Sequence, residues 1–111
     1  MTNPYATAAL PAFASAAIHV AVLPFAPGSE TTGMIVGTIL WVALGYGLTR
    51  GSRLVAYLAF LLGLFGGVYA FSGMMAYGGV SSILFGLMWI ADWAVAVLLF
   101  GPLWRSSAQR A

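Results

Sequence analysis

Asp92 is the residue of this chain whose type and position are best suited to chemistry. It lies in the middle of an apolar run from about 81 to 103 and is the only acid in it. If that run is a helix, Asp92 lies roughly 16 Å from each end at 1.5 Å per residue. A carboxylate near the bilayer centre is costly and usually has a function or a partner. Among its neighbours three and four residues away on the helix, the one polar group is the indole N–H of Trp89.

Two roles for Asp92 follow from this position. Its carboxyl is either protonated or held by donors from another helix or another chain. In the first role it binds a proton or a substrate in a transporter. In the second, which we favour at this stage, it is an anchor, either hydrogen-bonded to a neighbouring helix or paired with a basic residue of a partner subunit. We group Trp89 with it as part of a buried polar or coupling site.

His19 is the second candidate. Ser15 and Ala16 precede it by one turn, and such small residues leave room for a flat group. The imidazole is therefore a candidate ligand for a bacteriochlorophyll-type pigment, whereas a low-spin haem would need a second axial ligand. The alternative, which we favour, is a hydrogen bond to a neighbouring helix or to water. A contact with Asp92 requires a shifted helix or a bridging water, because the predicted heights differ by roughly 8 Å.

Composition excludes most other chemistry. The chain is 62% hydrophobic and 5% charged, whereas about a quarter of the residues in soluble proteins are charged. It contains no cysteine, one histidine and two acids, which argues against thiol catalysis and against a metal cluster built by this chain alone. The few arginines stand at the ends of apolar runs, so we predict a membrane protein without enzymatic activity and without a nucleic-acid partner.

Four apolar stretches separated by turn residues must position these side chains. We predict an all-α integral membrane protein, a single domain of residues 1–111 with four transmembrane helices in an up-down bundle. The predicted spans are about 5–23, 31–48, 54–75 and 81–103.

Local signals refine the ends of these helices. Asn3 is expected to cap the first helix, and Pro11 to kink it. Glu30 is expected to be a solvated residue at the start of the second helix. Ser81 or Ser82 is expected to cap the fourth.

Small residues recur at helical spacing in the two central spans. Gly33 and Gly37 lie four residues apart in the second span, and Gly63 and Gly67 do the same in the third. Stripes of this kind let helix backbones approach closely. Because a short loop joins the two spans, we predict that they pack against each other.

Charge sets the expected orientation. Arg50 and Arg53 follow the second span, Arg105 and Arg110 follow the fourth, and the opposite side carries Glu30. The positive-inside rule then places both termini in the cytoplasm, in a membrane of the bacterial inner-membrane type.

The outline of 111 residues and four spans resembles that of the small multidrug exporters, which work as dimers. In that family the essential acid lies in the first span. Here the first span carries His19, and the acid, Asp92, lies in the fourth. The resemblance is therefore one of outline and does not carry over a mechanistic residue.

The function that we favour from sequence is an accessory or stabilising subunit of a larger respiratory or photosynthetic membrane complex. Its partners would be other membrane subunits and lipids, with Asp92 and His19 as anchors. The first alternative is a small oligomeric proton-coupled transporter or channel that uses Asp92. The second is a subunit that binds a bacteriochlorophyll-type pigment or a lipid through His19.

Overall fold

A computed structural model of the protein describes residues 2–105. This part of the chain is helical apart from short connections, which confirms the all-α prediction. Its elements are α1 (Ala6–Val22), the short 3-10 helix η1 (Gly28–Glu30), α2 (Thr31–Thr49), α3 (Arg53–Ala76) and α4 (Gly79–Trp104). The segments 28–49, 53–76 and 79–104 are long and apolar enough to cross a membrane, whereas α1 has 17 residues. These apolar helices indicate a membrane protein.

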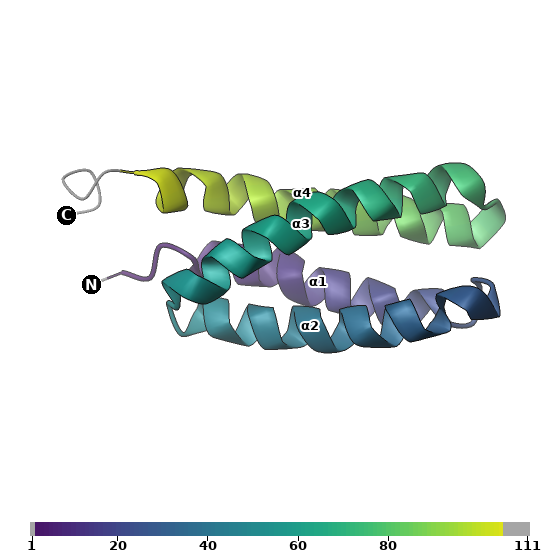
Figure 1. The fold of residues 1–111 in the computed structure, drawn as a ribbon, viewed down its shortest axis with the longest axis horizontal. Helices are drawn as coiled ribbons and strands as arrows, with labels where there is room; N and C mark the ends of the chain where they lie inside the picture. Colours follow the sequence, from purple (N-terminus) through teal and green to yellow (C-terminus); the bar gives the residue numbers. More distant parts are fainter. Residues whose placement is uncertain (1, 106–111) are drawn as a thin grey trace.

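The chain reverses direction at each connection, so that the start of α1, the α2–α3 connection and the end of α4 lie at one end (Figure 1). The folded chain measures 48 × 21 × 16 Å. The most extensive helix contacts are between α3 and α4 and between α1 and α2, and α1 also packs on α4. The contact between α2 and α3 is much slighter. The molecule is thus two tight helix pairs joined through α1 and α4.

This pairing corrects the predicted packing of the two central spans. The glycine stripe of α2 faces α1, because a Cβ at Gly37 would collide with the ring of His19 and one at Gly45 would lie 2.6 Å from the ring of Phe13. Around Gly33 there is open space, with no neighbouring atom within 4 Å of a Cβ built there. The stripe therefore does permit a close approach, but the helix that approaches is α1.

The stripe of α3 faces α4 in the same way. A Cβ at Gly63 would lie 2.6 Å from the backbone oxygen of Asp92, and one at Gly67 would collide with the ring of Trp93. A short loop makes two helices neighbours in the chain but does not decide which faces they turn to each other. The prediction failed for this reason.

The α2–α3 connection is specified by local sequence. Gly51 has φ 75°, a left-handed conformation that glycine adopts readily and that ends helices. The Ser52 amide then reaches back to the carbonyl of Gly47 at 3.1 Å, and the Gly51 amide to that of Leu48 at 3.1 Å. The Ser52 hydroxyl accepts the Val55 amide at 3.2 Å and so caps α3. One helix is stopped and the next started within three residues.

Asn3 does not cap α1 as predicted. The N-cap of α1 is Tyr5, whose amide donates to Oδ1 of Asn3 at 2.9 Å. The Asn3 side-chain amide instead donates to the carbonyls of Leu48 at 2.7 Å and Thr49 at 3.2 Å. Asn3 thus satisfies carbonyls that the last turn of α2 leaves without helical partners, and it ties the start of the chain to the end of α2.

The two serines expected to cap α4 also have other partners. The α4 helix begins at Gly79. The hydroxyl of Ser81 donates to the Phe25 carbonyl at 2.6 Å, and that of Ser82 donates to the Met74 carbonyl at 2.8 Å. Both serines therefore hold neighbouring segments at this end of the molecule.

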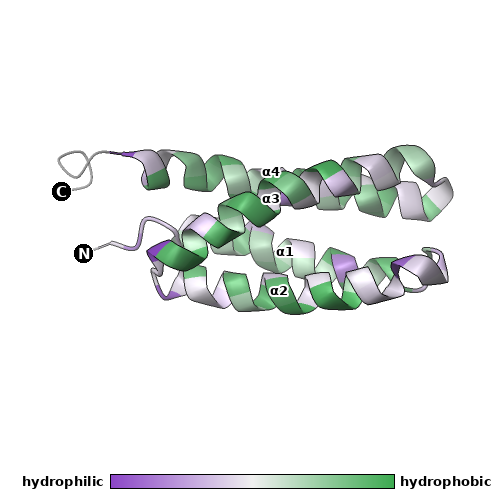
Figure 2. Cartoon of the chain, viewed as in Figure 1, coloured by the Kyte–Doolittle hydropathy of each residue, from purple (hydrophilic) through white to green (hydrophobic). Residues whose placement is uncertain are grey.

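Apolar residues extend along most of each helix, and hydrophilic residues concentrate near the connections (Figure 2). The buried apolar residues form two clusters. One contains Trp41, Val95 and Leu99, and the other contains Met34 and Phe85. Ser15, His19 and Asp92 are buried. His19 and Asp92 each lie in the chain between members of the two clusters, and Ser15 lies one turn before His19. A polar layer thus interrupts the core.

Candidate functional site

Asp92 finds its hydrogen-bond donor on α1. Its side chain is 1% exposed, and the buried hydroxyl of Ser15 donates to its Oδ1 atom. Asp92 lies near the middle of α4, thirteen residues after Gly79 and twelve before Trp104. The donor therefore comes from another helix of the same chain, and the bond joins the two helix pairs at the centre of the molecule.

His19 is connected to the same serine. Its Nδ1 atom lies 2.6 Å from the Ser15 carbonyl oxygen and 3.5 Å from the Ser15 hydroxyl. Because a carbonyl can only accept, we assign the ring proton of neutral His19 to Nδ1, which leaves Nε2 as an acceptor. Among the described residues no direct hydrogen bond joins His19 to Asp92. Ser15 connects them, in the place where the sequence suggested a water.

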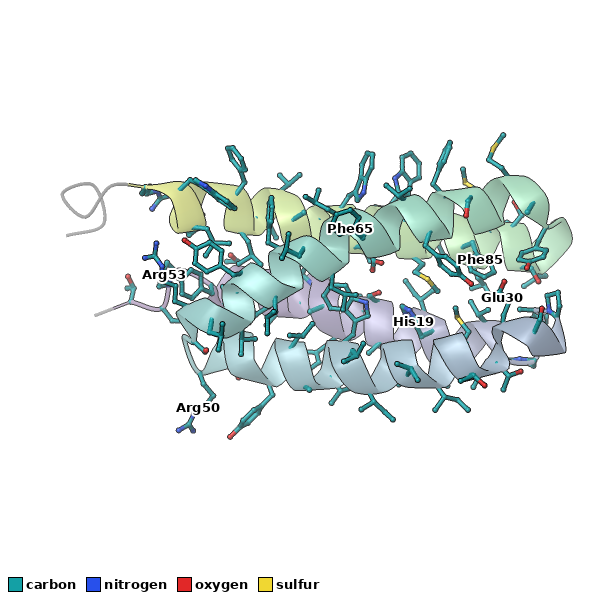
Figure 3. All side chains as sticks on the ribbon, in the orientation of Figure 1. His19, Glu30, Arg50, Arg53, Phe65 and Phe85 are labelled. Carbon is teal, nitrogen blue, oxygen red and sulfur yellow. The ribbon has the colours of Figure 1, made fainter. Side chains whose placement is uncertain are left out.

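A cavity of about 220 Å³ lies over this polar cluster. His19 of α1 and Asp92 of α4 line it, and Figure 3 shows His19 between the two helix pairs. The remaining lining residues come mainly from α2 and α3 and are apolar or aromatic; they are Gly33, Met34, Val36, Gly37, Leu40, Trp41, Leu62, Gly66, Tyr69 and Met88.

The cavity opens where α2 and α3 are least in contact. Its buried lining includes Met34 and Trp41, whereas Val36, Leu40 and Tyr69 are largely exposed. The exposed residues belong to α2 and α3 and therefore form the rim of the opening. The slight contact between these helices is thus the structural origin of the cavity.

Two glycines let the helices approach the polar groups. A Cβ at Gly66 would lie 2.8 Å from Oδ2 of Asp92, and one at Gly37 would lie 2.5 Å from Nε2 of His19. Sequence reasoning singled out Gly37, as a packing residue, but not Gly66. Nothing in the local sequence distinguishes Gly66, because its role depends on the carboxyl of another helix.

Trp89 is not part of this cluster. Its Nε1 atom is buried and has no hydrogen-bond partner within residues 2–105. Its ring packs against Phe71 and Trp93, with ring centroids 5.0 and 5.4 Å apart. Trp89 is also absent from the lining of the cavity. Its spacing from Asp92 along the helix suggested a shared site, but the indole turns toward other aromatic rings.

The second acid forms a separate cluster near the start of α2. The carboxylate of Glu30 accepts hydrogen bonds from the hydroxyls of Tyr69 and Tyr77, the latter at 2.6 Å, and Figure 3 places Glu30 beside Phe85 at this end. The bond to Glu30 raises the pKa of the Tyr77 phenol. Glu30 is at the start of α2, as predicted, but instead of being merely solvated it connects that start to the end of α3.

Metal and pigment binding receive no support from these contacts. In residues 2–105 no three His, Cys, Asp or Glu side chains are grouped so that they could hold a metal ion. The Cδ2–Nε2 edge of His19 lies against Gly37, so a macrocycle ligated at Nε2 would compete with α2 for space.

Sequence reasoning found Asp92 and His19 but did not give Ser15 a polar role. The spacing of Ser15 and His19, four residues apart on a helix, was a usable signal for contact between them. Comparison of the chain with protein-family models, with curated proteins and with solved structures finds no match.

Proposed function

We propose that the protein is a small proton-coupled membrane transporter with Asp92 as the group that binds protons and substrate in turn. The observation that carries this proposal is that Asp92 and His19 line one cavity of about 220 Å³ that opens between α2 and α3. Ionisable groups inside a membrane protein that face a cavity are typical of substrate and proton pathways.

The proposed arrangement has all four helices crossing the membrane. The 17 residues of α1 extend about 26 Å at 1.5 Å per residue, slightly less than a hydrocarbon core of about 30 Å. Local thinning of the bilayer accommodates such a mismatch at modest cost. The arginines at the α2–α3 connection and after α4 favour a cytoplasmic location for that end and both termini, in a membrane of the bacterial inner-membrane type.

The charge balance supports alternating occupancy of Asp92. No lysine or arginine occurs before residue 50 or between residues 54 and 104. An ionised Asp92 therefore has no lysine or arginine along its own helix or along α1 to neutralise it, and His19 of α1 is bonded to the Ser15 carbonyl and not to Asp92. A single serine hydrogen bond offsets only part of the cost of a buried charge. A proton supplies the missing positive charge in one state, and in the other the substrate takes the place of the proton at the carboxylate.

The accessory-subunit role stays a prediction with less support from the residues. Its argument used Asp92 and His19 as anchors for a partner. Both side chains are buried, and both bond to Ser15 of the same chain. They are therefore not presented on a surface where a partner helix would contact them.

The proposal is tested with purified protein in liposomes that contain a pH-sensitive dye and are held at an inside-acid proton gradient. Three probes share one body and differ in their polar group: 2-phenylethylammonium, its N,N,N-trimethyl analogue and neutral 2-phenylethanol. Passive entry is subtracted with protein-free liposomes. We expect at least one probe to drive proton movement that requires the wild-type protein.

Two variants test whether the proton movement depends on Asp92. Asp92→Asn should abolish the protein-dependent signal, because the amide cannot exchange a proton at this position. Ser72→Ala should leave it unchanged, because the Ser72 hydroxyl is exposed and bonds only to the Tyr69 carbonyl of its own helix, at 2.7 Å. If no probe moves protons, or if Asp92→Asn behaves as wild type, the transporter proposal is wrong. Stoichiometric co-purification with a membrane complex would then favour the subunit role.

A further inference from the structure

The polar groups of the cavity are matched to a ligand that donates hydrogen bonds. Nδ1 of His19 is occupied by the Ser15 carbonyl at 2.6 Å, so Nε2 is left with a lone pair and no proton. Oδ1 of Asp92 already accepts from Ser15, and Oδ2 lies on the side of Gly66. Nε2 lies beside Gly37 and Oδ2 beside Gly66, and both glycines line the cavity. With Asp92 ionised, each residue thus has an acceptor at the cavity wall, where α2 leaves too little space for a macrocycle but a small N–H donor needs much less. A ligand whose N–H groups reach both would satisfy them together.

The same groups favour positive charge on that ligand. No lysine or arginine lies on α1 or α4 to pair with an ionised Asp92, and the neutral His19 offers it no charge. Trp41 also lines the cavity, and an indole face attracts cations. A neutral ligand would leave the carboxylate charge buried without compensation, which is the costly arrangement.

The lining and the opening of the cavity favour a ligand with a small apolar part. Met34 and Met88 are buried in the lining, and the rim residues Val36 and Leu40 are exposed aliphatic side chains. The volume of about 220 Å³ corresponds to roughly seven water molecules at about 30 Å³ each. In the proposed membrane arrangement this opening faces lipid, so that a ligand would enter from the bilayer with an apolar part leading.

We propose that the ligand is a small primary ammonium ion with an apolar body, bound through N–H donors to Oδ2 of Asp92 and Nε2 of His19. This inference rests on the proposed transport function and specifies its substrate class. When the ammonium binds, the proton of the Asp92 carboxyl leaves to the aqueous phase, and the ammonium takes its place as the neutralising charge. A quaternary ammonium carries the same charge but has no N–H to donate.

Binding is measured by isothermal titration calorimetry of the full chain in lipid nanodiscs, with 2-phenylethylammonium and its N,N,N-trimethyl analogue as probes. Hydrogen bonds to charged groups contribute enough that their loss costs about ten- to a hundredfold in affinity. We therefore expect the trimethyl compound to bind at least about tenfold more weakly. Titrations in two buffers of different ionisation enthalpy should show proton release when the primary ammonium binds.

The His19→Phe variant separates hydrogen bonding from charge attraction, because it keeps a ring of similar shape and removes the acceptor. We expect it to weaken binding of the primary ammonium by about tenfold and to leave the trimethyl compound unchanged. Ser72→Ala should bind both probes as wild type does. Circular dichroism and gel filtration check that the variants fold.

The outcomes distinguish this inference from the function on which it rests. Equal or tighter binding of the trimethyl compound would overturn the substrate class, because N–H donors would then be irrelevant. Loss of both ligands in His19→Phe, with the fold intact, would also contradict it. If neither probe binds while 2-phenylethanol still drives Asp92-dependent proton movement in liposomes, the substrate class is wrong and the transport function stands.

Discussion

The two acids of this chain, Asp92 and Glu30, have similar bonding partners in very different surroundings. Each carboxylate accepts from hydroxyl groups of another segment of the chain. Asp92 has a single hydroxyl donor and is 1% exposed in the middle of α4. Glu30 has two phenol donors and lies at the end of the molecule, where its side chain is partly exposed.

The difference teaches that the two acids are separated by burial more than by bonding pattern, and it is burial that supports the role proposed for Asp92. Water near Glu30 screens its charge, so two phenols are enough to hold it as a connection between α2 and α3. At Asp92 the same kind of bond leaves a charge that the chain does not neutralise. This uncompensated charge is the basis of the proposal that Asp92 binds a proton and a cation in turn.

The largest expected effect is on transport. In the liposome assay Glu30→Gln should retain most of the proton movement, because its amide oxygen still accepts from the tyrosines, whereas Asp92→Asn should retain none. The measurement is the initial rate of dye response after subtraction of protein-free liposomes. Equal loss in both variants would remove the distinction drawn between the two acids.

The next largest expected effect is on the free energy of unfolding, through the contact between α3 and α4 at Asp92. Gly63→Ala should reduce the free energy of unfolding by about 1–3 kcal/mol, because overpacking forces backbone shifts and the new Cβ would lie 2.6 Å from the Asp92 carbonyl. Gly33→Ala is the matched control, since its Cβ would meet no atom within 4 Å. Gly33→Ala should leave the free energy of unfolding unchanged or raise it slightly. Denaturation with sodium dodecyl sulfate in mixed micelles gives both values, and equal destabilisation would contradict the helix pairing.

A smaller effect is expected at Ser15. Ser15→Ala removes the hydrogen bond to Asp92 and should lower the free energy of unfolding by about 0.5–1.5 kcal/mol. Ser72→Ala, which loses only an exposed bond within its own helix, should show no measurable change. The same denaturation experiment compares them. A Ser15→Ala variant as stable as Ser72→Ala would show that the serine is not a significant partner of Asp92.

The smallest expected effect is on the pKa of the Tyr77 phenol. Its phenol pKa is raised by the bond to the Glu30 carboxylate, so Glu30→Ala, which removes the acceptor, should move it back toward the ordinary value of about 10. Because the folded-state pKa is raised, the bond stabilises the protein below the unfolded-state value and is lost as pH rises through the folded-state value. Ultraviolet difference titration of wild type against Tyr77→Phe isolates this phenol. An unchanged titration in Glu30→Ala would rule out the bond.

Much of the helix layout was predictable because it depends on local patterns. Apolar run lengths placed the four helices within two residues of their observed ends. Gly51 and Ser52 show how local chemistry ends one helix and begins the next. Asn3, Ser81 and Ser82 were assigned the wrong partners, because each side chain bonds to a segment that is adjacent in space and not in sequence.

The candidate site was predictable in part. Asp92 and His19 were identified from residue type and depth, since a rare polar group in an apolar helix stands out. Ser15 and Gly66 were not, because a serine and a glycine are ordinary residues in membrane helices. Their roles arise when α1 and α3 are brought against α4.

The sequence by itself determined that this is an apolar, all-helical chain with one acid and one histidine within its apolar helices. Those properties depend on composition and on hydrophobic runs along the chain. Only the tertiary structure decided that α1 pairs with α2 and α3 with α4, that Ser15 connects Asp92 to His19, and that a cavity opens over them. The faces that helices turn to one another depend on packing across the whole molecule, which no single stretch of sequence specifies.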